Sequence, residues 1–540
     1  MTEVFDNQTT TQTPADVSHT DTDVHLTQTL HASPLEANLE PDIEHAVVED
    51  DPRVWSNTRK NVILFIISGA SVIVGLSTNI QNPADAQIEQ QLHATPGQIS
   101  LTLSLFVLIQ GNFAVIWSAI SEIKGRKLVY LLSLALFTLG SVVVAVSKTI
   151  GLMIGMQVIQ GAGSSAVFAI GAATLADIYE PHQRGSMMGV YYSAPLLGPS
   201  LGPIIGGVLT QTLSWRAVFW FLVIWGGVIF SAFLFLFHDT FRKERSSAYQ
   251  NVLKRHAREH KLTQAVRGEE KPVSEKKISE EGGEEQPTPK DVEAQQVVVP
   301  EAAIKAVKLS LADVNPFPPY MRILNRRNNV AILIPSGLLL AFNFSLTYTC
   351  ARTLAVYYNY DALKTGFVLF SYGIGGMIGS ILGGRWSDRT LARLKAANGG
   401  VSFPEMRLES TKIAMWWLPP SAIGYAWVCQ ERVHISTICG MLFFAGFFSI
   451  WIYASTLAYI VDANTGQSSS ALATNSSFRS ACAFIAGEIA VPLQDAMGDG
   501  GLYTLWAAVM LLAELMILLV LYKGKQWREA SIAKEKERSG

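Results

Sequence analysis

Three ionisable residues lie inside long apolar stretches, where no water stabilises their charge. Arg479 and Glu488 share one stretch, and Glu514 lies in the next. Ionisable groups at membrane depth are costly, so each is a functional candidate. A carboxylate buried alone favours its neutral form, which a proton carrier requires. We predict that Glu488 or Glu514 titrates and that Arg479 contacts an anion or acts as a counter-charge; the alternative is structural pairing or snorkelling.

Uncharged polar and aromatic side chains form a second group of candidates for substrate or proton contact. Gln157, Gln160, Asn343 and Tyr348 interrupt apolar stretches, and Trp451 lies in an aromatic stretch that would suit a ring or acyl chain. Polar groups at membrane depth are expensive unless they serve a site or join helices. The alternatives, that the amides only bridge helices and that half of the aromatic residues face lipid, stay open.

The stretches that hold these residues predict transmembrane helices. Of 540 residues, 49% are hydrophobic and 16% charged, whereas soluble domains carry about 25% charged residues. About 20 apolar residues cross a bilayer core, and a helix satisfies their backbone there. We therefore predict an all-α integral membrane protein with twelve spans, near residues 62–81, 98–118, 128–147, 151–175, 187–210, 217–237, 330–350, 366–385, 411–429, 435–458, 468–492 and 502–522.

Polar segments divide the predicted spans into two parallel halves, which is a transporter architecture. Residues 384–389 follow the second span of the second half, as residues 118–122 follow that of the first, and so indicate a weak repeat. The predicted parts are a disordered cytosolic tail (1–60), a six-helix bundle (61–237), a cytosolic linker (238–329), a second six-helix bundle (330–522) and a cytosolic C-terminal tail (523–540).

Lysine and arginine residues predict the orientation, because they are retained on the cytoplasmic side. With both termini in the cytoplasm, the outer loops hold few of them, and the loop at 82–97 holds none. We predict a multi-pass protein of the plasma membrane, with the vacuolar membrane as the alternative. The inner loops would then hold Lys124, Arg126, Lys127, Arg184, Arg385, Arg389, Arg393, Lys395, Arg407 and Lys412.

The fifth span carries the most specific pattern, G-x8-G-x3-G-P-x2-G-G. Glycines at near-helical spacing let a neighbouring helix approach closely, and proline removes one backbone hydrogen bond and bends the helix. Ordinary small-residue packing explains two or three such glycines but not the full set. The pattern predicts a helix that moves against its neighbour, and its residues are Gly189, Gly198, Gly202, Pro203, Gly206 and Gly207.

With this pattern the chain resembles the major facilitator superfamily, and within it the fungal drug:proton antiporters of the quinidine-resistance type. The resemblance covers roughly residues 55–525, and Asp177 and Arg184 before the fifth span and Trp215 after it add to it. It implies two pseudo-symmetric six-helix bundles that rock about a central site and export a substrate as protons flow inward. It also implies that spans one, four, seven and ten line the cavity, which favours Gln157, Gln160 and Asn343.

Two loops resemble the family's inner-gate motif, G-x-x-x-D-R-x-G-R-K. The first loop matches the last three residues of this motif, and Glu122 stands where the family has aspartate. The resemblance implies a latch in which Glu122 or Asp388 pairs with a basic residue or a helix N-terminus in one state only. Anchoring by positive charge is the alternative, and both can hold. The matching residues are Gly125, Arg126 and Lys127 in the first loop and Gly384, Asp388 and Arg389 in the second.

The fourth span departs from the family at one position. The family often shows R-x-x-Q-G there, and this chain has Gln157 in place of the arginine, with Gln160 and Gly161 matching. That arginine is associated with proton coupling, so the departure leaves the coupling residue of this chain open.

The lack of enzyme and nucleotide-binding motifs favours transport as the function. The chain has no GxSxG, HExxH or Walker sequence, so we predict neither an enzyme nor an ATP-driven pump, no cofactor or metal, and no nucleic-acid partner. We predict a monomer that exports drugs, organic acids or amphiphilic metabolites in exchange for protons. The alternatives are a facilitator or importer of a small metabolite or polyamine and, from another class, a membrane receptor or scaffold.

Overall fold

Local sequence signals set the boundaries of the helices. The computed structural model describes residues 50–180, 187–188, 190–191, 193–242, 249, 317–464 and 468–539. Helix α3 begins with a capping box between Thr95 and Gln98, with Pro96 at its first position, where proline fits a helix start. Helix α4 begins directly after Gly125, whose φ of 88° favours glycine.

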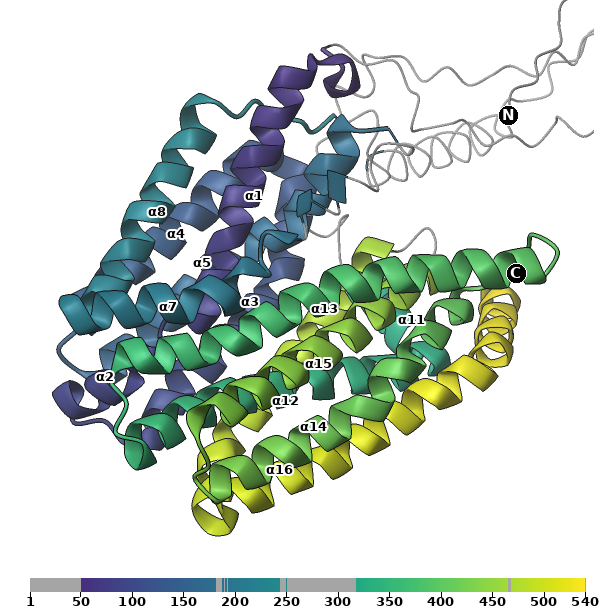
Figure 1. Ribbon diagram of the computed structural model, residues 1–540. Helices are drawn as coiled ribbons and strands as arrows, with labels where there is room; N and C mark the ends of the chain where they lie inside the picture. The colour runs from purple at the N-terminus through teal and green to yellow at the C-terminus, as the bar shows by residue number, and fades with distance from the viewer. Residues whose placement is uncertain are drawn as a thin grey trace, which may run out of the picture. The chain divides into compact units, whose positions relative to one another are not determined.

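The first half of the described chain runs through seven helices (Figure 1). A short 3₁₀ turn, Asn82–Ala84, joins the first helix to the second. The helices are α1 (Asn57–Asn79), α2 (Asp85–Leu92), α3 (Pro96–Lys124), α4 (Arg126–Ala145), α5 (Ile150–Ile178), α7 (Leu197–Thr212) and α8 (Trp215–Phe235).

The second half begins with a short helix that falls inside the stretch predicted as linker. Most of that linker, residues 243–248 and 250–316, lies outside the described residues, as does most of the predicted N-terminal tail. The helices are α11 (Phe317–Asn325), α12 (Arg327–Tyr357), α13 (Ala362–Ala397), α14 (Lys412–Gln430), α15 (Ile435–Ala463) and α16 (Ser468–Ser539).

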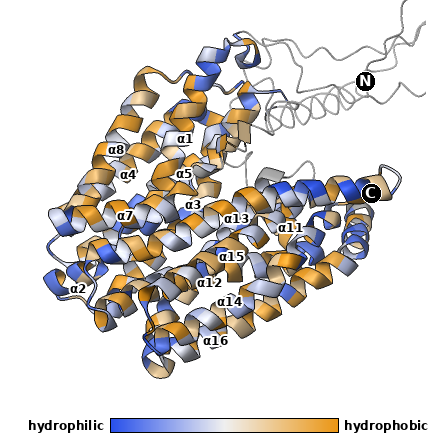
Figure 2. Cartoon of the chain, viewed as in Figure 1, coloured by the Kyte–Doolittle hydropathy of each residue, from blue (hydrophilic) through white to orange (hydrophobic). Residues whose placement is uncertain are grey.

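The predicted all-α membrane class is confirmed. Every predicted span coincides with a helix, although α7 has only 16 residues in the described part. In that part, nine helical segments are long and apolar enough to cross a bilayer. Hydrophobic residues cover much of α8 and α16, and hydrophilic ones gather on α2 (Figure 2). Large apolar side chains such as Phe65 and Trp416, 78% and 80% exposed, suit contact with lipid chains.

Helix α16 contains the last two predicted spans. A break separates them at Gly498, where φ is 68°, a backbone conformation that glycine adopts without strain. The side-chain oxygen of Gln430, at the end of α14, accepts a hydrogen bond of 3.1 Å from the backbone N–H of Gly500. This bond ties the turn between the two spans to the neighbouring helix.

The helices build two hydrophobic cores, one for each half. The first extends from Trp55 to Phe237 and the second from Ile323 to Val520, and few residues of the second half join the first core. The main contacts between the halves join α7 to α13 and α3 to α16. These are the fifth span with the eighth and the second with the eleventh, so exchanging the halves converts one pair into the other. The interface therefore follows the parallel repeat.

Glycines let α7 lie directly against α1 of its own half. A Cβ atom at Gly198 would overlap the backbone of Gly75, and one at Gly206 would overlap the carbonyl group of Ile80. At Gly202 the added carbon would lie 3.3 Å from the nearest atoms of α1. The glycine face of α7 thus replaces side-chain contacts by backbone contacts, as the pattern predicts.

A second face of α7 meets α13 of the other half. A Cβ atom at Gly207 would lie 2.6 Å from the carbonyl oxygen of Ala362. In return, Gly366 of α13 leaves room for the carbonyl oxygen of Pro203, and Gly373 leaves room for the backbone of α7 near Ser200. The pattern predicted in the fifth span is therefore completed by glycines of α13.

The close approach at Gly198 predicts a large effect of one methyl group. We expect Gly198→Ala to destabilise the protein by about 1–3 kcal/mol, because an overpacked helix contact must move apart. Gly227→Ala in α8 is the matched control, since nothing lies within 4 Å of its added carbon. Thermal unfolding of the purified protein measures both. Equal melting temperatures for the two variants would contradict the packing described here.

Candidate functional site

The two halves are hydrogen-bonded to each other at the end where α1 ends and α3 begins, called here the Pro96 end. The hydroxyl of Ser100 on α3 donates to the carbonyl oxygen of Gly487 on α16 at 2.6 Å. The hydroxyl of Tyr348 on α12 donates to the carbonyl oxygen of Pro96 at 2.8 Å. Tyr348, predicted as a substrate or proton contact, therefore holds the two halves together.

Glu488 lies at the same interface. Its carboxylate accepts a short hydrogen bond from the hydroxyl of Ser104 on α3. Tyr348 lies close enough to interact electrostatically with Glu488, and also with Asp85 and Glu89 further toward the Pro96 end. One of the two predicted titrating carboxylates thus makes a contact that must break if this end opens.

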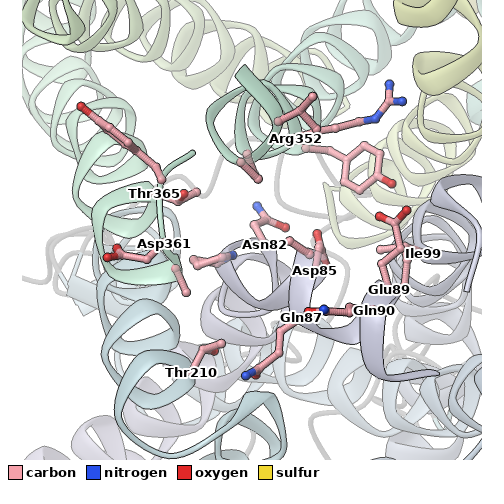
Figure 3. Close-up of a pocket in the computed structure, with 18 of the residues that line it drawn as sticks. Asn82, Asp85, Gln87, Glu89, Gln90, Ile99, Thr210, Arg352, Asp361 and Thr365 are labelled. Carbon is pink, nitrogen blue, oxygen red and sulfur yellow. The ribbon is translucent and has the colours of Figure 1, made fainter. Parts of the chain in front are cut away.

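A cavity of about 330 Å³ lies between the halves at the Pro96 end. Figure 3 shows the side chains of Asp85 and Glu89 on one side of it and Arg352 of α12 on another. Asp361 at the start of α13 and Thr210 of α7 line it as well. The cavity therefore brings acidic and basic groups of both halves together. Asp85 and Glu89 come from residues 82–97, which the sequence predicted only as a loop.

A chain of amide hydrogen bonds leads from this cavity into the first half. Gln157 of α5 donates to Gln81 at 2.6 Å, and Gln81 donates to Asp85 at 3.0 Å and to Thr102 at 3.1 Å. One oxygen of Asp85 and the oxygen of Gln157 are buried without a partner in the described part of the chain. Gln157, where the family often has arginine, is therefore linked to a buried carboxylate.

The other predicted amides differ in their surroundings. Gln160 donates to the hydroxyl of Ser141 on α4 at 2.8 Å, so it bridges two helices of one half. The side-chain oxygen of Asn343 on α12 is buried, and no described group bonds to it. Of these two residues, Asn343 has the capacity to bind another molecule, and Gln160 fits the structural alternative.

Arg479 lies over an aromatic ring of the second half. Its guanidinium carbon is 3.6 Å from the ring centre of Tyr453 on α15. Glu514, the other deep carboxylate, is 7% exposed, and one of its oxygens has no partner among the described residues. In that part of the chain no ion pair joins Arg479 to Glu514, so each deep charge has a separate environment.

Trp451 contributes to packing between helices. It lies against Gly383 of α13, where an added Cβ atom would come within 2.7 Å of its indole. Its ring also makes an edge contact with Trp386 at 6.5 Å between centres. Trp451 is 8% exposed, so the ring of Tyr453 is better placed than that of Trp451 to contact a ligand beside Arg479.

The opposite end, called here the Gly125 end, carries an ion pair within the first half. Arg126 contacts Asp177 at 3.2 Å and donates to Ser121 at 2.6 Å. Thr240 donates to the same carboxylate at 3.1 Å. Among the described residues, Arg126 thus pairs with Asp177 rather than with Glu122, which was predicted as the acidic residue of the latch.

Asp239 completes this cluster and was not predicted. Its carboxylate accepts a hydrogen bond of 3.1 Å from the backbone N–H of Arg126, and it lies where a Cβ atom of Gly125 would be. Glu122 lies within electrostatic reach of Arg126, and Lys127 donates to the carbonyl oxygen of Leu234 at 3.0 Å. The cluster fixes the start of α4 against the end of α8.

The second half has a corresponding cluster around Arg407. Its guanidinium contacts Asp388 of α13 at 3.1 Å and makes an ion pair with Asp462 of α15. Burial alone would lower the pKa of Arg407, but hydrogen bonds and charge interactions with both aspartates outweigh burial and raise it. Arg389 is exposed, and Gly384 faces open space. Of the predicted second-loop residues, only Asp388 joins the cluster.

Both clusters at the Gly125 end stay within one half, whereas Ser100, Tyr348 and Glu488 make contacts across the interface at the Pro96 end. Two predicted residues, Gly189 and Arg184, lie outside the described residues. Asp85 was missed because it follows the first apolar stretch directly, and a carboxylate at that position usually marks a loop.

The comparisons with known proteins agree with this architecture. The family model of the Major Facilitator Superfamily matches residues 67–486. The chain is 26% identical to the MFS antiporter QDR3 of Candida albicans, over 89% of this chain and 80% of that protein. It is 25% identical to Citrate exporter 1 of Aspergillus niger, over 91% of each chain. The predicted resemblance to fungal drug antiporters is thereby confirmed.

A solved structure agrees as well. The fold is similar to that of the human organic anion transporter MFSD10, with a TM-score of 0.54 at 15% identity, over 86% of this chain and all of that one. These proteins are transporters, so the prediction of a transporter rather than an enzyme is confirmed. With its family match over most of its length, the chain belongs to the Major Facilitator Superfamily.

Proposed function

We propose that the protein exports small organic molecules by alternating access, in exchange for protons. The observation that carries the proposal is the distribution of contacts: the halves are joined through reciprocal helix pairs, with hydrogen bonds between them at the Pro96 end and, near the middle of α3, between Ser477 and Asn112. The clusters at the Gly125 end lie within single halves. Rocking about α7–α13 and α3–α16 would exchange which end is closed.

The distribution of basic residues supports an orientation for this motion. Lysines and arginines gather at the Gly125 end, around Lys124, Arg126 and Arg385, and such residues are retained in the cytoplasm. The Pro96 end then faces outward, and the conformation described here is closed to the outside. A substrate would enter this conformation from the cytoplasm, as export requires.

Glu488 is the carboxylate best placed to couple protons to this cycle. Opening the Pro96 end would break its hydrogen bond to Ser104 and bring its carboxylate into contact with the outer solution. Its carboxylate contacts Ser104 of α3. Tyr348 of α12 interacts electrostatically with Glu488 and also with Asp85, Glu89 and Arg352. Neutral Glu488 would re-enter the interface at lower desolvation cost than its charged form.

The similarity to exporters supports the direction of transport. QDR3 is an antiporter by name, and Citrate exporter 1 is an exporter by name. We therefore take drugs and organic acids as the substrate classes to test first. A facilitator or importer in the same fold is the second candidate, and it differs in needing no proton gradient.

A disulfide across the closed interface should stop transport. A Cβ atom built on Gly487 lies 3.0 Å from that of Ser104 and 2.9 Å from the ring of Phe344, so the pair Ser104→Cys and Gly487→Cys is close enough for a disulfide once α3 and α16 move apart by about 0.5 Å and the Phe344 ring gives way. The four native cysteines are first replaced by serine. We expect oxidation to abolish efflux and reduction to restore it, whereas each single variant stays insensitive to oxidation. Full efflux by the oxidised double variant would refute alternating access at this interface.

Dissipating the proton gradient should remove active export. Yeast cells that express the protein are loaded with quinidine or citrate, and efflux is followed with and without a protonophore. Proton exchange predicts that the difference from cells without the protein disappears when the protonophore is added. Efflux that persists against a substrate gradient under these conditions would exclude proton coupling.

Glu488→Gln should uncouple transport from protons. In proteoliposomes with an imposed pH gradient, we expect the variant to equilibrate substrate but not to accumulate it, because the amide that replaces the Glu488 carboxylate cannot release a proton. Glu431→Gln, in an exposed turn, is the control and should accumulate substrate as the unaltered protein does. Glu514→Gln is measured beside it. If only Glu514→Gln loses accumulation, the titrating role belongs to Glu514 instead.

A further inference from the structure

We propose that Arg479 is the binding point for a carboxylate of an organic anion, and that the substrates of this protein belong to that class. The inference rests on the proposed function and makes its substrate specific. Arg479 lies near the middle of the eleventh span, and its Nε is buried with no hydrogen-bond partner among the described residues. In the same part of the chain, no carboxylate lies within ion-pair distance of it.

A cation in this position is expensive unless another charge offsets it. Removing a guanidinium from water is costly, and a cation–π contact recovers only part of that cost. Tyr453 also hydrogen-bonds to the guanidinium, but its neutral hydroxyl and ring bring no negative charge, so the contact with Tyr453 does not balance the charge. An incoming carboxylate would, since guanidinium binds carboxylate through two parallel hydrogen bonds.

The surroundings of Arg479 are suited to an anion with an apolar body. The ring of Tyr453 lies 3.6 Å from the guanidinium carbon, and Tyr372 of α13 is within electrostatic reach. Tyr453 offers an aromatic surface and a hydroxyl group, whereas Tyr372 is buried in the core. A planar carboxylate such as an aromatic acid would place its charge on Arg479 and its ring beside Tyr453.

The neighbours of Arg479 connect this position to the other half. Asn112 of α3 accepts a hydrogen bond of 2.6 Å from Ser477 and donates one of 3.4 Å to Ser480. Ser480 follows Arg479 directly, and Gly111 of α3 leaves room for its hydroxyl. An anion that shifts Arg479 would act on the α3–α16 contact, which is one of the two contacts that must rearrange during transport.

Neutral and cationic substrates fit this position less well. A neutral molecule would leave the half-buried guanidinium without a counter-charge, and a cation would add repulsion at membrane depth. Glu514 does not offset the charge, because no described ion pair joins the two residues. The structure therefore favours an anion over the polyamine or drug-cation alternatives.

Binding of benzoate and its neutral isostere benzamide tests the inference on the purified full-length protein. We expect benzoate to bind at least tenfold more tightly than benzamide, as one charge-assisted hydrogen-bonded pair implies. Arg479→Gln should abolish that preference. Arg432→Gln is the matched control, since Arg432 also lies over a tyrosine ring, at 4.5 Å from that of Tyr357, and it should keep the preference.

Thermal unfolding without ligand separates a binding role from a structural one. If Arg479 serves to bind an anion, Arg479→Gln removes a charge that has no counter-ion in the unliganded protein, and the melting temperature stays unchanged or rises. If the arginine serves to hold α16 on α15, the same variant lowers it, and the inference fails. Arg479→Lys keeps the charge but loses the paired geometry, so it should bind benzoate more weakly than the unaltered protein.

The outcomes distinguish this inference from the proposed function. No difference between benzoate and benzamide, or equal benzoate binding by Arg479→Gln, would overturn the anion site even if proton-driven efflux of another compound is found. Arg479-dependent benzoate binding would support the site even if efflux proves independent of protons.

Discussion

The glycine faces of helix α7, which carry no side chains, allow the close helix contacts on which the arrangement of the two halves depends. Helix α7 lies with its backbone against α1 on one face and against α13 on another, and a single methyl group at Gly198, Gly206 or Gly207 would collide with neighbouring main chain. Such an interface holds few interlocking side chains. Its two surfaces can slide or tilt without first withdrawing side chains from pockets, which suits a contact that must form and separate in every transport cycle.

Polar groups within the membrane fall into two kinds according to their partners. Gln160 is satisfied by Ser141 within one half, and its role is to join helices. Arg479, Asn343 and Glu514 retain buried atoms without a partner in the described residues. Unsatisfied groups of this kind cost free energy in the empty protein, so a transporter gains by having a substrate or a proton satisfy them.

Sequence patterns predicted the helices and the two halves well, because length and hydropathy are local properties. The near-helical spacing of glycines is likewise visible in the chain, and the structure has close backbone approaches at Gly198, Gly206 and Gly207. The sequence patterns did not predict which residues from distant parts of the chain pair with each other. Asp239 beside Gly125 and Asp462 beside Arg407 come from distant segments whose meeting depends on the fold. Asp85 was missed for a related reason, because it is linked to the first half through Gln81 and the distant Gln157.

The most direct test of the account measures both ends of the molecule at once. Spin labels at Gln90 and Lys364 report on the Pro96 end, and labels at Lys124 and Arg393 report on the Gly125 end; all four residues are exposed. Distances are measured by pulsed electron resonance in nanodiscs across pH and with substrate. Alternating access predicts that one distance lengthens as the other shortens. Two distances that stay fixed, or that change in the same direction, would contradict it.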